Sequence, residues 1–149
     1  MTTRRQTLQQ GAALAALLAA AGLLPQAAHA TPAFDAKTVA DALKALGAGG
    51  LSESKDVHLT APDIAENGAV VPMGVSTSLP GVKQLLVLVE KNPSPLVARF
   101  ELNDAVEPNF LTRAKMGQSS DVYAVALTSD GKALYAKKEV KVTLGGCGG

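Results

Sequence analysis

The chain is poor in the residues that build metal centres and disulfides. Its 149 residues include one cysteine, two histidines and no tryptophan, and aromatic residues make up 3% of the sequence. Structural zinc sites need four Cys or His ligands, and iron–sulfur clusters need several thiolates. We therefore assign no metal ligands and expect no internal disulfide. With so few aromatic side chains, a hydrophobic core must consist mainly of Val, Leu and Ala.

Charge is sparse and nearly balanced. Lys and Arg number 14 against 13 Asp and Glu, which gives a formal net charge of +1. A nucleic-acid-binding domain normally carries a clear excess of basic residues on one face. The composition therefore predicts no nucleic-acid partner.

The first 30 residues have the pattern of an export signal. Arg4 and Arg5 precede a mildly apolar run at 11–24, and Ala28 and Ala30 follow it. This pattern predicts a twin-arginine signal peptide that is cleaved after Ala30, and it places the mature protein in the periplasm. The apolar run is shorter than the roughly 20 residues that a membrane-spanning helix needs. We therefore expect no permanent membrane anchor.

The mature chain begins with a helical pattern. Within residues 31–50, apolar residues recur at helical spacing from Val39 to Leu46. Asp35 is placed to cap the start of this helix, and Gly47 is placed to end it. The pattern predicts one short amphipathic helix, joined by a Gly-rich link to the domain that follows.

Residues 51–144 are expected to form one β domain. Apolar residues alternate with polar ones, or form short unbroken runs, and Gly- and Pro-containing turns separate the runs. The segments expected as strands are 57–60, 69–75, 82–90, 96–102, 111–116, 122–127 and 134–144. Asn67 and Gly68 are expected to form the hairpin turn between the first two. Six to eight strands at this spacing predict an all-β fold, an Ig-like antiparallel β-sandwich.

The chain ends in a symmetric motif, residues 145–149, in which Cys147 lies between Gly145 and Gly146 on one side and Gly148 and Gly149 on the other. Glycine-rich chain is flexible and slender, so the motif predicts a swinging arm that can enter a narrow channel. If the last strand ends near Leu144, the sulfur lies within roughly 10 Å of that end. No basic side chain follows Lys141 in the sequence, so the thiol is only weakly activated. The arm therefore presents its thiol to chemistry that other proteins supply.

Other polar residues have mainly structural interpretations. His58 lies in a strand pattern and is expected to face solvent rather than to act in catalysis. Asp63 and Glu66 flank a predicted loop, where contact with a partner is the functional alternative. Lys137 and Lys138 are expected on a solvated strand face, and the alternative is that they steer anions toward the arm.

Three segments together resemble one known family. They are residues 64–72, residues 89–93 and residues 140–149, of which the last contains the terminal Gly-Gly-Cys-Gly-Gly motif. With the twin-arginine signal, they make the chain similar to SoxY, the sulfur-carrier subunit of the bacterial thiosulfate-oxidising Sox multienzyme system.

The resemblance implies a specific role for Cys147. Thiosulfate would be joined oxidatively to its sulfur, the sulfone group would be hydrolysed off as sulfate, and the remaining sulfane sulfur would be oxidised and released. The chain would then be a non-catalytic carrier with covalent adducts in place of a cofactor. Its implied partners are SoxZ in a heterodimer and, transiently, the enzymes SoxAX, SoxB and SoxCD.

Two alternatives to this function remain open in the sequence. In one, the chain is a structural subunit, and Cys147 forms an intermolecular disulfide. In the other, it is a ubiquitin-like sulfur carrier that uses the carboxylate of Gly149. Export to a compartment without ATP and the β-sandwich pattern argue against the second.

Overall fold

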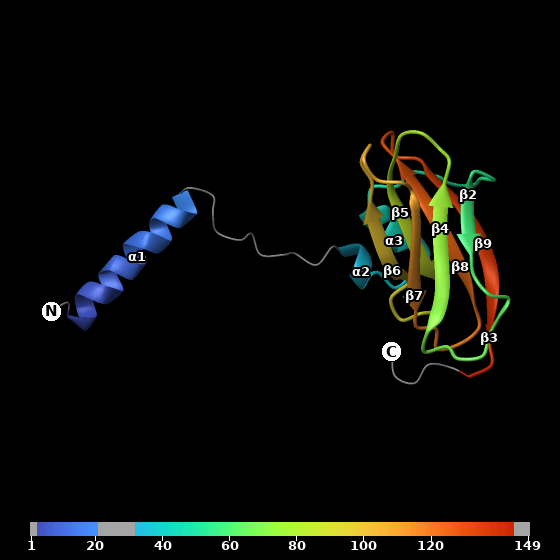
Figure 1. The fold of residues 1–149 in the computed structure, drawn as a ribbon, viewed down its shortest axis with the longest axis horizontal. Coiled ribbons are helices and arrows are strands. Elements are labelled where there is room, and N and C mark those ends of the chain that lie inside the picture. The colour runs from blue at the N-terminus through green and yellow to red at the C-terminus, as the bar shows by residue number, and fades with distance from the viewer. Residues whose placement is uncertain (1–2, 21–31, 145–149) are drawn as a thin grey trace. The chain divides into compact units, whose positions relative to one another are not determined.

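The computed structural model describes residues 3–20 and 32–144, and the chain divides into two units, Met1–Ala30 and Thr31–Gly149 (Figure 1). In the first unit, α1 (Arg4–Ala20) begins with a reciprocal cap. The amide of Thr3 donates to Gln6 Oε1 at 3.0 Å, and the amide of Gln6 donates to Thr3 Oγ1 at 3.4 Å. These two bonds satisfy amides that have no partner within the helix.

The second unit is a two-layer β-sandwich, which confirms the predicted fold class. Its larger sheet has the order β1-β9-β8-β5-β6, and β3 pairs with the edge of β9. The strands of this sheet are β1 (Leu51–Glu53), β3 (Ile64–Ala65), β5 (Val82–Val89), β6 (Leu96–Glu101), β8 (Ser120–Thr128) and β9 (Ala133–Val142). β1 and β3 both run parallel to β9, whereas the other pairs in the sheet are antiparallel.

The smaller sheet lies in front of the larger one in Figure 1. Its order is β2-β4-β7, with β2 (Val57–Thr60), β4 (Val71–Thr77) and β7 (Asn109–Ala114) all antiparallel. Side chains alternate along β4, so Val71, Met73 and Val75 face the interior and are at most 2% exposed.

The core has two parts. One lies between the sheets and is built of Val, Leu, Ala and Met, with the rings of Phe100 and Phe110 stacked 4.3 Å apart where β6 meets β7. The other lies where α2 (Pro32–Asp35) and α3 (Val39–Ala45) cover the opposite face of the larger sheet. Residues 85–89 of β5 are therefore buried on both faces, as their unbroken apolar sequence predicts.

The helical segment differs from the prediction at its start. α2 and α3 are separate helices, and the N-cap of α3 is Thr38, whose hydroxyl accepts from the amide of Asp41 at 3.0 Å. Asp35 ends α2 and does not cap α3. Asp and Thr are both favoured N-cap residues, with Asp the better of the two, so the sequence pattern alone did not point to Thr38. The predicted end is confirmed, because Gly47 has a φ of 75°, a conformation that favours glycine.

The predicted hairpin turn at Asn67 and Gly68 is wrong. β2 and β4 do pair, but Thr60 lies opposite Gly74, so the connection between them is far longer than a two-residue turn. That connection contains β3, which pairs with β9 instead. Asn67 still forms a local turn, since its side chain accepts from the amide of Ala69 at 2.9 Å.

Candidate functional site

The end of β9 and the two residues after it, which we call the base of the predicted arm, are fixed by backbone hydrogen bonds to β3 and to the residues on either side of it. The amide of Lys141 donates to the carbonyl of Asp63 at 3.0 Å, and the amide of Thr143 donates to that of Ala65 at 3.1 Å. The amide of Gly68 donates to the carbonyl of Leu144 at 2.7 Å. The chain is thus held in a hydrogen-bonded ladder up to Leu144, the last residue that the structure describes.

Side chains reinforce this base. The amide of Val142 donates to Ser119 Oγ at 2.9 Å, and the hydroxyl of Thr143 donates to the carbonyl of Glu66 at 3.2 Å. The carbonyl of Gly68 accepts from the amide of Met116 at 2.7 Å, which links the base to the segment after β7. Two segments that are distant in sequence, 63–68 and 116–119, therefore hold the base of the predicted arm.

Lys138 fastens the loop before β3 to β9. Its Nζ lies 2.8 Å from Asp63 Oδ1 and donates to the carbonyl of Ala61 at 2.8 Å. The hydrogen bond from Lys138, and then its charge, hold the pKa of the Asp63 carboxyl below its ordinary value of 3.8. Because Asp63 is fully exposed to solvent, the pair positions the loop more than it stabilises the fold.

We expect Lys138→Met to return the pKa of Asp63 toward 3.8, as followed by an NMR titration of its carboxyl. A pKa that is lowered in the folded state adds stability above the unfolded value, and this is lost as the pH falls through the folded value. Any difference in stability between the two proteins should therefore shrink below about pH 3.8. Lys137→Met is the control, and an unchanged titration of Asp63 in Lys138→Met would contradict the assignment.

The side chain of Lys137 contacts β8 and not the loop before β3. Its Nζ lies 3.0 Å from Asp121 Oδ2 and 5.7 Å from the centre of the Tyr123 ring. The hydrogen bond to Asp121 is the main cause of a raised pKa of Lys137. Both lysines are thus engaged in local contacts, which leaves little support for a role in steering anions. His58 is exposed on β2, as predicted.

A groove runs over the outer face of the smaller sheet. It has a volume of about 760 Å³, and its lining includes Pro62, Pro72, Gly74, Leu111 and Arg113. Leu111 lies across the backbone of Gly74, because a Cβ atom built at Gly74 would be only 2.9 Å from Leu111 Cδ2. Leu111 is nevertheless 82% exposed.

This groove was not predicted from the sequence. One signal for it was present in the sequence. Residues two apart in a strand share a face, so the apolar Leu111 is expected on the same outward face as the polar Asn109 and Arg113. Taken alone, one exposed leucine is unremarkable, and only the pairing of β2, β4 and β7 shows the groove.

The predicted site residues are distributed as follows. Arg4 and Arg5 are exposed in the first turn of α1, and Ala28 and Ala30 lie outside the described residues. So do Cys147 and its four flanking glycines, Gly145, Gly146, Gly148 and Gly149.

Within residues 3–20 and 32–144, no group of three or more His, Cys, Asp or Glu side chains could hold a metal ion. None of the helices in these two ranges is long and apolar enough to cross a membrane.

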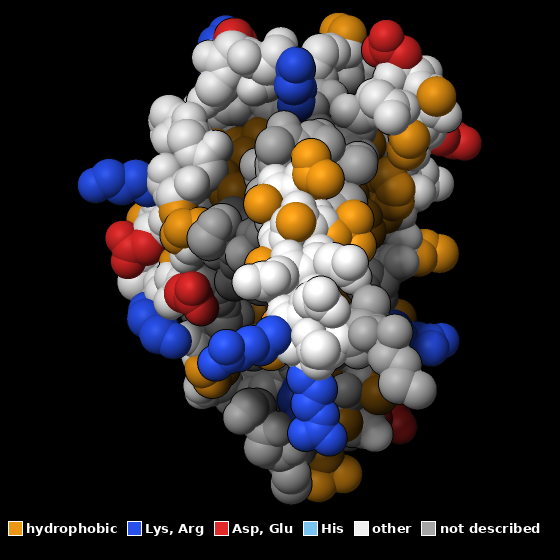
Figure 2. All heavy atoms as spheres, turned by 90° about the vertical axis from the view of Figure 1, so that its left-hand side faces the viewer, with side chains coloured by type: hydrophobic (Ala, Val, Ile, Leu, Met, Phe, Trp, Pro, Cys, Tyr) orange, Lys and Arg blue, Asp and Glu red, His pale blue; other side chains and the backbone are white. Residues whose placement is uncertain are grey.

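Basic and acidic side chains are interspersed on the face drawn in Figure 2. Some opposite charges pair directly, as Arg99 Nε does with Glu101 Oε1 at 3.2 Å.

Comparison with known proteins gives a consistent family assignment. Residues 43–147 match the family model described as sulfur oxidation protein SoxY. The structure of the sulfur carrier protein SoxY from Chlorobium limicola f thiosulfatophilum is 36% identical, covers 72% of this chain and 97% of its own, and gives a TM-score of 0.65. No curated protein sequence matches the chain.

More distant structures share the fold alone. A putative superoxide reductase from Thermotoga maritima is 16% identical with a TM-score of 0.53, and covers 62% of this chain and 93% of its own. The superoxide reductase (neelaredoxin) from Ignicoccus hospitalis is 19% identical with a TM-score of 0.50, and covers 58% and 81%.

Proposed function

The chain belongs to the SoxY family of sulfur oxidation proteins, and from this we propose that it carries its sulfur cargo covalently on Cys147. A sulfur carrier needs one reactive atom that can form and release a bond to sulfur, and a thiolate does this readily. Cys147 is the only cysteine in the sequence and lies within the segment that matches the family. That coincidence is the observation that carries the proposal.

The proposed cargo derives from thiosulfate. The Cys147 thiol loses its proton and bonds to the outer sulfur of thiosulfate, while two electrons pass to an acceptor of a partner enzyme, such as haem iron. Water then cleaves the sulfone group from this adduct, which gives sulfate and a Cys147 persulfide without net electron transfer. The remaining sulfane sulfur gains three oxygen atoms from water as six electrons leave to an acceptor of the same class. A final hydrolysis releases a second sulfate and returns the thiol.

A fixed base followed by flexible glycines suits a thiol that is carried into the active sites of other proteins. Because the ladder ends at Leu144, the three residues that follow allow the sulfur to lie up to about 10 Å from that residue. A resident nucleophile is normally held rigidly beside a general base. Within the described residues the sole histidine, His58, lies on β2 rather than on the elements that form the base of the arm. Activation by partner enzymes accounts for a weakly activated thiol on such an arm.

Membership in the family places the chain in the Sox system. We propose that it pairs with SoxZ and meets SoxAX, SoxB and SoxCD in turn, in the periplasm, as a non-catalytic subunit after twin-arginine export and cleavage behind Ala30. In this scheme, residues 31–50 cover the sandwich formed by 51–144, residues 145–149 are the arm, and the adducts on Cys147 take the place of a cofactor.

The proposal is tested by intact mass spectrometry of the protein from the periplasm of cells grown on thiosulfate, before and after reductant. We expect a reductant-labile addition of sulfur or of a thiosulfonate group, mapped to Cys147 in the C-terminal peptide. Sulfur on the carboxylate of Gly149 would instead favour the ubiquitin-like alternative, which the β-sandwich already disfavours. An unmodified or merely disulfide-linked Cys147 would favour a structural subunit.

A further inference from the structure

Several exposed apolar side chains lie on the segments that meet at the base of the predicted arm and on the groove next to them. Among the described residues of the sandwich, four large apolar side chains are more than half exposed: Ile64 at 58%, Val70 at 53%, Leu111 at 82% and Leu144 at 71%. We call these four the root patch. The other exposed apolar side chains of this unit, such as Leu51 at 41% and Val106 at 37%, are less accessible.

The members of the root patch are linked through the fold. Ile64 lies in β3 opposite Lys141, three residues before Leu144. Val70 follows the turn in which Gly68 binds the carbonyl of Leu144. The groove around Leu111 is lined by Pro62 and Pro72, each two residues from Ile64 or Val70, a separation of about 7 Å along an extended chain. The base of the arm therefore adjoins the apolar groove.

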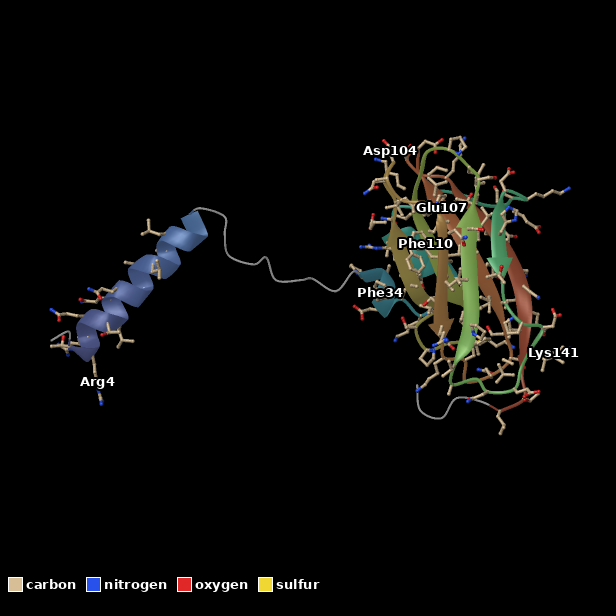
Figure 3. All side chains as sticks on the ribbon, viewed as in Figure 1. Arg4, Phe34, Asp104, Glu107, Phe110 and Lys141 are labelled. Atoms are coloured by element: carbon tan, nitrogen blue, oxygen red, sulfur yellow. The ribbon has the colours of Figure 1, made fainter. Side chains whose placement is uncertain are left out.

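Two cations accompany this apolar surface. Arg113 lines the groove, and Lys141 lies at the β3 end of β9, on the outer edge of the domain (Figure 3). Among the side chains that the structure describes, neither cation has an ion-pair partner, whereas Lys137 and Lys138 both do. The surface thus offers apolar contact area with unneutralised positive charge beside it.

Because the proposed arm is short, any enzyme that receives Cys147 must contact the surface around Leu144. If Cys147 is the carrier site, as proposed above, an active site that receives it must approach to within about 10 Å of Leu144. The rim of such an active site then lies directly against the residues around Leu144. Large apolar side chains exposed in one area normally mark an interaction site.

We infer that the root patch, with Arg113 and Lys141, is the docking surface for the enzymes that receive Cys147. The matching surface on each enzyme is an apolar rim around a narrow entrance, with acidic side chains placed to pair with the two cations. The apolar contacts supply most of the affinity, and the charges favour encounter and orientation. This inference rests on the proposed function and adds to it the surface and chemistry of the partner contact.

The test uses the carrier paired with SoxZ in a reconstituted Sox system. Thiosulfate-dependent turnover is measured against carrier concentration for the wild type and for the double variant Val70→Ser/Leu111→Ser. We expect the KM for the carrier to rise about tenfold or more, with kcat little changed, since both substitutions remove exposed contact area. Leu51→Ser/Val106→Ser is the matched control, because it removes exposed apolar side chains elsewhere, and its KM should match that of the wild type.

Two further measurements show whether weaker docking is the cause of the higher KM. Alkylation of Cys147 by iodoacetamide should proceed at the same rate in all three proteins, which shows an equally accessible thiol. Arg113→Glu should also raise the KM and weaken its dependence on salt.

Other results would overturn the inference. An unchanged KM in Val70→Ser/Leu111→Ser, with normal labelling of Cys147, would show that the enzymes dock elsewhere while the carrier role stands. Loss of SoxZ binding in the double variant, seen by size-exclusion chromatography, would assign the patch to the subunit interface. A changed self-association would assign it to a second copy of the chain. The proposed function fails separately, if the wild-type protein carries no sulfur on Cys147.

Discussion

Replacing Cys147 by Ser is expected to reduce thiosulfate-dependent turnover in the reconstituted Sox system to the level seen without carrier. The hydroxyl of serine is far less acidic than a thiol and forms no stable bond to sulfane sulfur, so no adduct can be loaded. The measurement is sulfate production, or electron transfer to the acceptor, at saturating enzyme concentrations. This is the largest effect that we expect from one substitution in this chain.

Stability provides the control for that experiment. Cys147 lies beyond Leu144, where the hydrogen-bonded ladder of the described chain ends, and the core clusters lie within the sandwich. The Cys147→Ser variant should therefore unfold at the same temperature as the wild type. Turnover by this variant at the wild-type rate would refute the carrier role, and a lowered melting temperature would mean that the loss of turnover has a structural cause.

The Leu86→Ala variant is expected to lose about 2 to 5 kcal/mol in its free energy of unfolding. Leu86 lies in β5, is fully buried, and packs in the cluster that joins the larger sheet to α2 and α3. Truncation removes apolar contacts and leaves a cavity between a sheet and two short helices. Denaturant unfolding gives the change directly.

Leu111→Ala is the matched control for Leu86→Ala, because it makes the same chemical change at a side chain that is 82% exposed. Its cost should stay within about 0.5 kcal/mol. Equal costs for the two variants would contradict the packing of α2 and α3 on the larger sheet. A neutral Leu111→Ala variant would also show that this leucine is dispensable for folding, as expected of a residue in a docking surface.

Local patterns were sufficient to predict most of the strands. The apolar run at 85–89 in β5 and the turn before β9 are signals carried by neighbouring residues, and the fold class follows from the number and spacing of such segments. The cap of α3 was missed because Asp35 and Thr38 are both good caps in the same stretch.

Long-range pairing could not be predicted in the same way. β3 is only Ile64–Ala65, and its partner lies more than seventy residues later in β9. A local pattern cannot specify a pair so short and so distant, so Asn67 and Gly68 suggested a hairpin instead. The root patch depends on this pairing, because β3 brings Ile64 beside the end of β9. The proposed cargo site, Cys147, stays a prediction from the sequence alone, whereas the surface beside the end of β9 required the structure.

The ladder between β3 and β9 also sets the free length of the proposed arm. Each residue released from that ladder adds about 3.3 to 3.6 Å to the length of free chain. Opening the bonds that hold Thr143 and Leu144 would therefore lengthen the tether by about 7 Å. Such openings at the end of a sheet cost less than global unfolding and recur continually in the native state. In the proposed carrier, the free energy that holds this short pair of strands together therefore determines how far from the sandwich the thiol of Cys147 can reach.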